Sequence, residues 1–238
     1  MIYPNVRRHA SFFIFPCLII GLLLSITSFC ARADTTTPVI FIHGRNAPPG
    51  VWDTMIAQLE SQGFSADRLF AWDYDTSAST NEVVAGQFAD FVKEVLLRTG
   101  AAQVNIVTHS LGSLSTRWYV KFGGGTRTVR NWISLAGPNH GTVLAWACAL
   151  WDQGCRDMTP GSYVLSQLDA NGVEIIPPVR FWTFWSNCDE QIDPPSSTPL
   201  NGATNTQEVL CLKHNDQLTN PTIETYVRSI LQNDRMPP

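Results

Sequence analysis

The segment Thr108-His109-Ser110-Leu111-Gly112 contains the residue best placed to act as a nucleophile. It lies between an apolar run at residues 104–107, which predicts a buried strand, and a helical pattern over residues 111–122. A serine between a strand and a helix is typical of the nucleophile elbow used in acyl transfer. That turn requires small residues two places before and after the serine, and Gly112 meets the requirement whereas Thr108 replaces the expected glycine. The alternative is an ordinary helix N-cap, for which serine is also preferred.

Acyl transfer through a serine also needs hydrogen-bond donors aimed at the oxyanion that develops on the carbonyl group. In an elbow of this kind, one donor is the backbone N–H of the next residue, here Leu111. The other comes from the loop after an earlier strand, and His43-Gly44-Arg45 follows an apolar run at residues 39–42. We therefore expect the backbone N–H of Arg45 to be the second donor. The simpler interpretation of His43-Gly44 is a turn in which glycine lets the backbone bend.

Two histidines, His140 and His214, follow Ser110 in the chain. Elbow enzymes carry their triad in the order serine, acid, histidine, so the general base is expected late in the sequence. His214 stands between the last predicted strand and the last predicted helix, and we assign it as the base. We expect His140 to brace its own loop through hydrogen bonds. His43 and His109 precede or adjoin the elbow and are expected to be structural.

The acid of the triad is expected after the next-to-last strand, which we predict over residues 181–185. Asp189 is the first carboxylate after that strand and is our choice, with Glu190 and Asp193 as alternatives. Asp152 lies too early in the chain. A carboxylate in this position fixes the imidazole tautomer and stabilises the imidazolium that forms during the reaction.

The elements that must position these residues alternate along the chain. Apolar runs predict strands at residues 39–42, 68–72, 104–107, 132–135, 181–185 and 209–212, while residues 137–178 show little regular pattern. Helical patterns separate these runs. This order predicts an α/β fold with a mostly parallel central sheet of about six strands and helices on both faces.

Three helix-terminus signals accompany this pattern. Ser79 and Glu82 have the spacing of a capping box, and Gly100 is typical of the end of the same helix. Asn220-Pro221 predicts the start of the last helix, because asparagine caps well and proline suits the first helical position.

The N-terminal segment has the pattern of a secretory signal peptide. Arg7 and Arg8 precede an apolar run at residues 12–26, and Ala31-Arg32-Ala33 places small residues where a signal peptidase reads. The run is shorter than the roughly 20 residues of a membrane-spanning helix, and bulky Phe29 argues against a lipoprotein at Cys30. We predict cleavage after Ala33 and a single domain over residues 34–238, with export to the extracellular space or periplasm.

Composition excludes several function classes. The full chain has 16 basic and 20 acidic residues, and removal of residues 1–33 takes away three arginines and no acid. The remaining net charge of −7, without a basic block, argues against nucleic-acid binding. Eight tryptophans and twelve phenylalanines argue against disorder.

Four cysteines remain after residue 33, and an even number in an oxidising compartment suggests two disulfides. Three pairings are possible, and we favour Cys148–Cys155 with Cys188–Cys211 because each joins neighbours in sequence. A zinc site is the competing interpretation, but no pair has the C-x-x-C spacing usual for zinc, so we predict no metal.

These segments together resemble the bacterial secreted class 2 lipases, small α/β-hydrolases that act on triacylglycerols and related esters. The matching segments follow one another through nearly all of the chain after residue 33: residues 39–45, 108–112, 135–142, 184–194, 196–206 and the region around His214. The resemblance implies a Ser-Asp-His triad at Ser110, Asp189 and His214, and it implies no cofactor. A Cys188–Cys211 bridge would then tie the acid loop to the base loop.

The resemblance therefore implies hydrolysis of an acyl-ester lipid. We expect no stable insertion into a membrane, and the sequence does not decide between contact with a lipid–water interface and its absence. A polyester depolymerase or general carboxylesterase would share every motif, and an acyltransferase could use the same machinery. The alternative from another class is a binding protein on the same fold with an inert site. Such proteins usually lose a triad residue, whereas this chain keeps all three in order.

One apolar run stays ambiguous. Residues 145–151, which include Trp146, Leu150 and Trp151, lie in the irregular stretch at residues 143–178. They predict either an ordinary core patch or the wall of an acyl-binding cleft, and the whole stretch could act as a lid.

Overall fold

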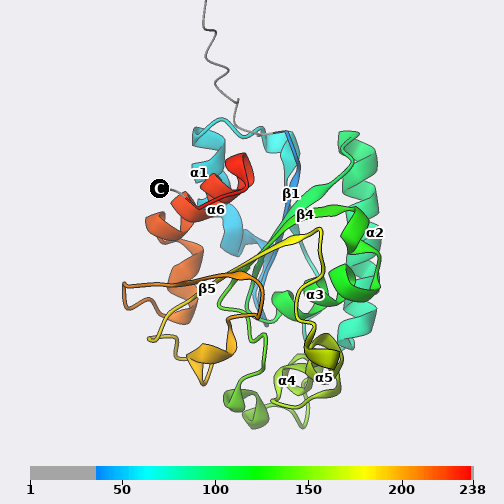
Figure 1. Cartoon of the computed structure of the whole chain (residues 1–238), viewed down its shortest axis with the longest axis vertical. Coiled ribbons are helices and arrows are strands. Elements are labelled where there is room, and N and C mark those ends of the chain that lie inside the picture. The colour runs from blue at the N-terminus through cyan, green and yellow to red at the C-terminus, as the bar shows by residue number, and fades with distance from the viewer. Residues whose placement is uncertain (1–35, 237–238) are drawn as a thin grey trace, which may run out of the picture. The chain divides into compact units, whose positions relative to one another are not determined.

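Six parallel strands form one sheet in residues 36–236, the part of the chain that the computed structural model describes. The predicted signal peptide and its cleavage position lie outside these residues. The sheet has the order β2-β1-β3-β4-β5-β6 (Figure 1), and its strands are β1 (Val39–Ile42), β2 (Leu69–Trp72), β3 (Val104–His109), β4 (Val129–Leu135), β5 (Arg180–Trp185) and β6 (Thr204–Gln207). Because the strands are parallel, their carboxyl ends lie at one edge of the sheet.

Helices cover both faces of this sheet (Figure 1). Helices α1 (Asp53–Ser61) and α6 (Pro221–Asn233) pack on one face, while α2 (Asn81–Thr99) and α3 (Gly112–Phe122) pack on the other. The predicted α/β architecture is confirmed. Within residues 36–236, no helix has both the length and the apolar character needed to cross a membrane. The remaining helices are short: η1 (Pro49–Trp52), η2 (Ala66–Arg68), η3 (Gly125–Arg127), η4 (Val143–Ala147), α4 (Gln153–Met158), α5 (Tyr163–Leu168), η5 (Ala170–Gly172), η6 (Pro195–Ser197) and η7 (His214–Leu218).

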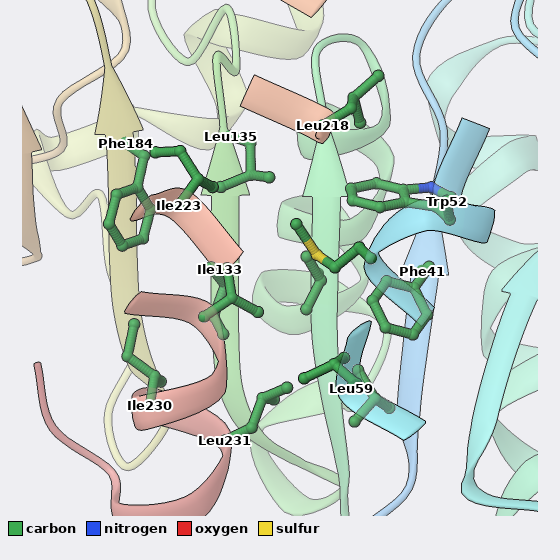
Figure 2. Close-up of a cluster of buried hydrophobic side chains, with 14 of the residues drawn as sticks. Phe41, Trp52, Leu59, Ile133, Leu135, Phe184, Leu218, Ile223, Ile230 and Leu231 are labelled. Carbon is green, nitrogen blue, oxygen red and sulfur yellow. The ribbon is translucent and has the colours of Figure 1, made fainter. Parts of the chain in front are cut away.

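Alternation along the strands divides the core between the two faces. In β1, Val39 and Phe41 face the cluster under α1 and α6, whereas Ile40 and Ile42 face the cluster under α2 and α3. Figure 2 shows the first cluster, in which side chains of the strands meet those of the covering helices. The central strands are buried on both sides, as their continuous apolar sequence predicts.

Two of the three predicted helix-terminus signals are confirmed. Gly100 ends α2 in the left-handed conformation with φ of 66°, and its N–H donates to the Leu96 carbonyl. The Asn220 side chain accepts hydrogen bonds from the first N–H groups of α6.

The predicted capping box at Ser79 and Glu82 is wrong. Helix α2 begins at Asn81 with Thr80 in the N-cap position, and no side chain of the cap accepts a hydrogen bond. The N–H of Asn81 instead donates to Oδ2 of Asp157 at 3.0 Å. A carboxylate 76 residues away therefore does the capping, and it places a negative charge at a helix N-terminus, where it is favourable.

The predicted strand at residues 209–212 is also wrong. The last strand is β6, whose polar residues pair with β5 at the edge of the sheet. Val209 is 96% exposed and lies in the loop that follows. The backbone of residues 204–207 pairs with β5, which satisfies its hydrogen bonds although its side chains are polar. The apolar character of residues 209–212 therefore does not indicate a strand.

The long connection between β4 and β5 is helical in part, although its sequence shows little periodicity. It contains η4, α4, α5 and η5, and α5 packs against α3 through Leu165 and Leu114. The buried guanidinium of Arg117 in α3 holds this connection from within. It bonds Oδ1 of Asp169 at 2.7 Å and the carbonyl oxygens of Asn139, Leu168 and Glu174.

Two disulfides link these elements, Cys148–Cys155 and Cys188–Cys211, with the pairing favoured from the sequence. The first closes a short loop within the β4–β5 connection. The second joins the segment after β5 to the segment after β6, so that the two loops at this edge of the sheet are covalently connected.

Replacement of both Cys188 and Cys211 by alanine should lower the free energy of unfolding by roughly 3 kcal/mol, because the bridge closes a loop of 23 residues. The double replacement of Cys148 and Cys155, which are 7 residues apart, should cost about 2 kcal/mol. Urea denaturation of the oxidised proteins measures both values. A loss at the first pair no larger than that at the second would contradict the loop-length account.

Candidate active site

Ser110 occupies a sharp turn between β3 and α3. Its φ is 53°, in the left-handed region that residues with side chains rarely adopt, and its N–H donates to the Leu135 carbonyl at 3.0 Å. A Cβ on Gly44 would lie 2.8 Å from the Cβ of Ser110, and a Cβ on Gly112 would lie 2.7 Å from the carbonyl oxygen of His43. The turn therefore requires glycine at both of these positions.

Thr108, the departure from the expected elbow pattern, has a structural explanation. Its side chain is fully buried, and its Oγ1 lies 2.8 Å from the point that a Cβ of Gly112 would occupy. The threonine fits because the glycine on the other side of the turn leaves that space free.

The loops after β5 and β6 bring Asp189 and His214 together. Nδ1 of His214 lies 2.9 Å from Oδ2 and 3.1 Å from Oδ1 of Asp189, and both side chains are buried. Oδ1 of Asp189 also accepts hydrogen bonds from the backbone N–H groups of Gln191 and Ile192. The carboxylate is therefore fixed from two sides and the imidazole is held through Nδ1.

The Asp189 carboxyl is ionised at neutral pH. Burial acts to raise its pKa, but the hydrogen bond and charge of His214 and the two backbone N–H groups outweigh that effect, so the pKa lies below its usual value. A lowered pKa means that the ionised carboxylate stabilises the fold above its ordinary pKa, and that this contribution is lost as the pH falls through the lowered value.

The two alternative acids, Glu190 and Asp193, make other contacts. The Glu190 side chain is exposed, but its Oε2 accepts the backbone N–H of His214 at 3.0 Å, so it holds the histidine's main chain. Asp193 is exposed, and its backbone bonds Thr142 and Val143.

His140 and His43 contact residues other than the Asp189–His214 pair. Nδ1 of His140 donates to the Ser197 carbonyl at 2.9 Å, and its Nε2 lies 3.3 Å from Oε2 of Glu174. His43 is buried and stacks on Tyr74.

His109 has a role that the sequence did not reveal. Its Nε2–H donates to the backbone carbonyl of His214 at 3.1 Å, and the two rings lie 4.6 Å apart. Burial, with the nearby charge of His214, lowers the pKa of His109 to about 3, so the ring is neutral at physiological pH. The residue before Ser110 thus holds the backbone of His214.

Ser110 and His214 line one pocket of about 440 Å³. Its walls come from the loops after β1, β4, β5 and β6, and they include the apolar residues Val51, Leu144, Ala145, Met158, Ile192 and Leu218. A volume of this size, with apolar side chains beside polar groups that can orient a ligand, is typical of a small-molecule site.

Arg45 lines the same pocket as Ser110, and Leu111 is the residue next to Ser110 in the chain. The neighbour of Arg45, Asn46, has a φ of 55° and donates its N–H to Oγ1 of Thr76 at 3.0 Å. Leu111 directly follows Ser110 at the N-terminus of α3, where backbone N–H groups attract negative charge. Within residues 36–236, no group of three His, Cys, Asp or Glu side chains is arranged to hold a metal ion.

The apolar run at residues 145–151 is neither a core patch nor, for its large side chains, a wall of the pocket. Trp146 is 61% exposed, Leu150 89% and Trp151 70%. Ala145 is the buried member, and it contacts the pocket together with Cys148. Both interpretations are therefore wrong for Trp146 and Trp151, whose side chains are mostly exposed to solvent and do not line the pocket.

The fold and the elbow define an α/β-hydrolase. The sequence profile of the family "Lipase (class 2)" matches residues 36–194. The chain therefore belongs to the class 2 lipases, a family of carboxylic ester hydrolases.

Solved structures share the fold at low sequence identity. Aspergillus fumigatus lipase B superposes with a TM-score of 0.72 at 18% identity, over 87% of this chain and 56% of that one. The mature form of Bacillus licheniformis lipase BlEst2 gives 0.67 at 17% identity, over 85% and 95%. In sequence, the chain is 29% identical over 91 residues to the Arabidopsis thaliana protein "Lecithin-cholesterol acyltransferase-like 4". The aligned residues make up 37% of this chain and 17% of that protein.

Asp189→Asn should lower kcat for ester hydrolysis by about 10⁴-fold, because an amide no longer fixes the tautomer of His214. Asp193→Asn is the matched control and should stay within about twofold of wild type, because the Asp193 side chain is exposed and the residue makes its hydrogen bonds through its backbone. Initial rates on p-nitrophenyl butyrate measure both. A severe loss at Asp193 with a mild one at Asp189 would exchange their assignments.

Proposed function

We propose that the protein is a secreted serine carboxylester hydrolase of the lipase type, with Ser110 as nucleophile, His214 as general base and Asp189 as the acid. The observation that carries the proposal is the buried Asp189–His214 pair, at 2.9 Å, whose histidine lines the same pocket as the strained Ser110. The family membership supports the reaction class.

In the first half of the proposed reaction, Oγ of Ser110 attacks the ester carbonyl carbon while Nε2 of His214 takes the hydroxyl proton. The carbonyl oxygen becomes an oxyanion, which accepts hydrogen bonds from the backbone N–H groups of Arg45 and Leu111. His214 then gives its proton to the leaving alcohol, and the acyl group stays on Ser110. Asp189 stabilises the imidazolium while it exists.

In the second half, a water molecule attacks the acyl-enzyme carbonyl and gives its proton to His214. The tetrahedral intermediate collapses, the proton returns to Oγ of Ser110, and the carboxylic acid is released. These steps use only side chains and backbone groups of this chain, so the proposal includes no cofactor.

Export is part of the proposal. The basic and apolar N-terminal pattern supports a signal peptide over residues 1–33, which leaves residues 34–238 as the mature single domain. The two disulfides support an oxidising compartment, because such bonds rarely persist in a reducing cytosol.

The proposed substrate is an acyl ester presented at a lipid surface. Nine consecutive apolar residues, 143–151, form the cap segment, which adjoins the pocket through Leu144 and Ala145. Five of its large side chains are exposed: Val143, Leu144, Trp146, Leu150 and Trp151. Exposed apolar side chains that follow one another in the chain mark an interaction surface, and residues 143–151 include no charged side chain that a neutral lipid would have to desolvate.

Ser110→Ala should abolish hydrolysis, at a cost on the order of a millionfold in kcat, because the triad acts as a unit. Labelling by a fluorophosphonate should disappear with it, while circular dichroism stays unchanged. His214→Ala should be nearly as damaging, whereas His140→Ala should keep most of the activity. A wild-type protein that takes up no fluorophosphonate would instead be an inert binding protein on this fold.

The double variant Leu150→Gln/Trp151→Gln should bind phosphatidylcholine vesicles roughly 30-fold more weakly than wild type, since two large apolar contacts are lost. It should hydrolyse p-nitrophenyl acetate at the wild-type rate and emulsified triolein at least about tenfold more slowly. Leu97→Gln removes an equally exposed leucine from α2 and is the control. Unchanged vesicle binding, or a greater loss on a polyester film than on triolein, would overturn the lipid assignment.

A further inference from the structure

An ion pair joins the loop that carries the proposed oxyanion donor to Asp152, the residue that directly follows the cap segment. Nε of Arg45 donates to Oδ2 of Asp152 at 2.7 Å, although the two residues lie 107 positions apart in the sequence. The carboxylate is almost fully buried, whereas about a third of the arginine side chain is exposed. The mechanism proposed above uses the backbone of Arg45 and leaves its side chain without a role.

Asp152 is itself firmly held. It is the N-cap of α4, where its Oδ1 accepts the N–H of Cys155 at 2.9 Å. Its own N–H donates to the carbonyl of Cys148 at 3.1 Å, and Cys148 and Cys155 form a disulfide. The next residue, Gln153, donates its N–H to the Ser77 carbonyl at 2.8 Å. One carboxylate oxygen is thus occupied by the cap of α4, and the other is presented to Arg45.

Within residues 36–236, the bond to Asp152 is the one hydrogen bond that holds Arg45 itself. The residues on either side are bonded to the rest of the fold or to each other. Nδ1–H of His43 donates to the Gly44 carbonyl at 2.9 Å, the Tyr74 hydroxyl donates to the His43 carbonyl at 2.9 Å, and the Asn46 N–H donates to Oγ1 of Thr76 at 3.0 Å. An oxyanion donor must be held within a fraction of an ångström, because a displacement of about 1 Å can cost about 100-fold in rate.

We infer that Asp152 is a positioning residue for catalysis: it holds the Arg45 side chain so that the Arg45 backbone N–H stays directed at the oxyanion. The inference rests on the proposed function. It makes the disulfide-linked segment between Cys148 and Cys155 part of the machinery that stabilises the transition state. The competing role is purely structural, in which the ion pair only attaches the cap segment to the body of the protein.

Asp152→Asn separates the two roles, because asparagine caps a helix as well as aspartate and so preserves the bond to Cys155. Its amide cannot pair with the guanidinium as a carboxylate does. We expect kcat for p-nitrophenyl butyrate to fall roughly 10- to 100-fold, with KM within about twofold and little change in Tm. A trifluoromethyl ketone, which adds to the serine as a tetrahedral oxyanion, should bind more weakly by the same factor as the fall in kcat. A non-reacting alcohol of the same chain length should bind equally well.

The variant Arg45→Met is a second, independent test, because it removes the ion pair but keeps the hydrogen bond of Asp152 to the Cys155 N–H at the start of α4. If the two residues act through one bond, the double variant Arg45→Met/Asp152→Asn should lose no more kcat than either single variant. Multiplicative losses, a change in KM alone, or wild-type affinity for the ketone would overturn the inference. Failure of the proposed function looks different, because wild type would then neither hydrolyse esters nor react with a fluorophosphonate.

Discussion

The left-handed turn at Ser110 is the constraint on which the rest of the site depends. Its φ of 53° is unfavourable for a residue with a side chain, so the surrounding structure must hold it in place. Strand β3 is buried along its whole length at the middle of the sheet, and the N–H of Ser110 is bonded to β4. The glycines at positions 44 and 112 then follow from geometry, because any side chain there would collide with the turn.

A parallel sheet converts this one turn into a site. All carboxyl ends lie at one edge, so the loops after β1 and β6 bring Arg45 and His214 to the pocket of Ser110. The loop after β5 brings Asp189 against His214. Secondary contacts then restrict each loop. The disulfide between Cys188 and Cys211 ties the loop of Asp189 to the loop of His214, and His109 bonds the main chain of His214.

The connection between β4 and β5 links several parts of the structure. Arg117 anchors it from inside, whereas its apolar cap segment faces outward and leaves large side chains exposed beside the pocket. The same connection supplies Asp157 to the start of α2 and Asp152 to Arg45. A segment without a regular sequence pattern thus links the pocket wall, a core helix and the loop that follows β1.

The sequence by itself determined what depends on neighbours in the chain. The bounds of β1, the glycine that ends α2 and the asparagine that begins α6 follow from local sterics and hydrogen bonds, and the order of Ser110, Asp189 and His214 follows from the order of the elements. Only the tertiary structure decided contacts between distant residues: the carboxylate that caps α2, the polar edge strand β6, the exposure of Trp146 and Trp151, and the bonds of His109 and Arg45. Such contacts depend on which side chains the finished sheet brings within a few ångströms, and no local pattern records that.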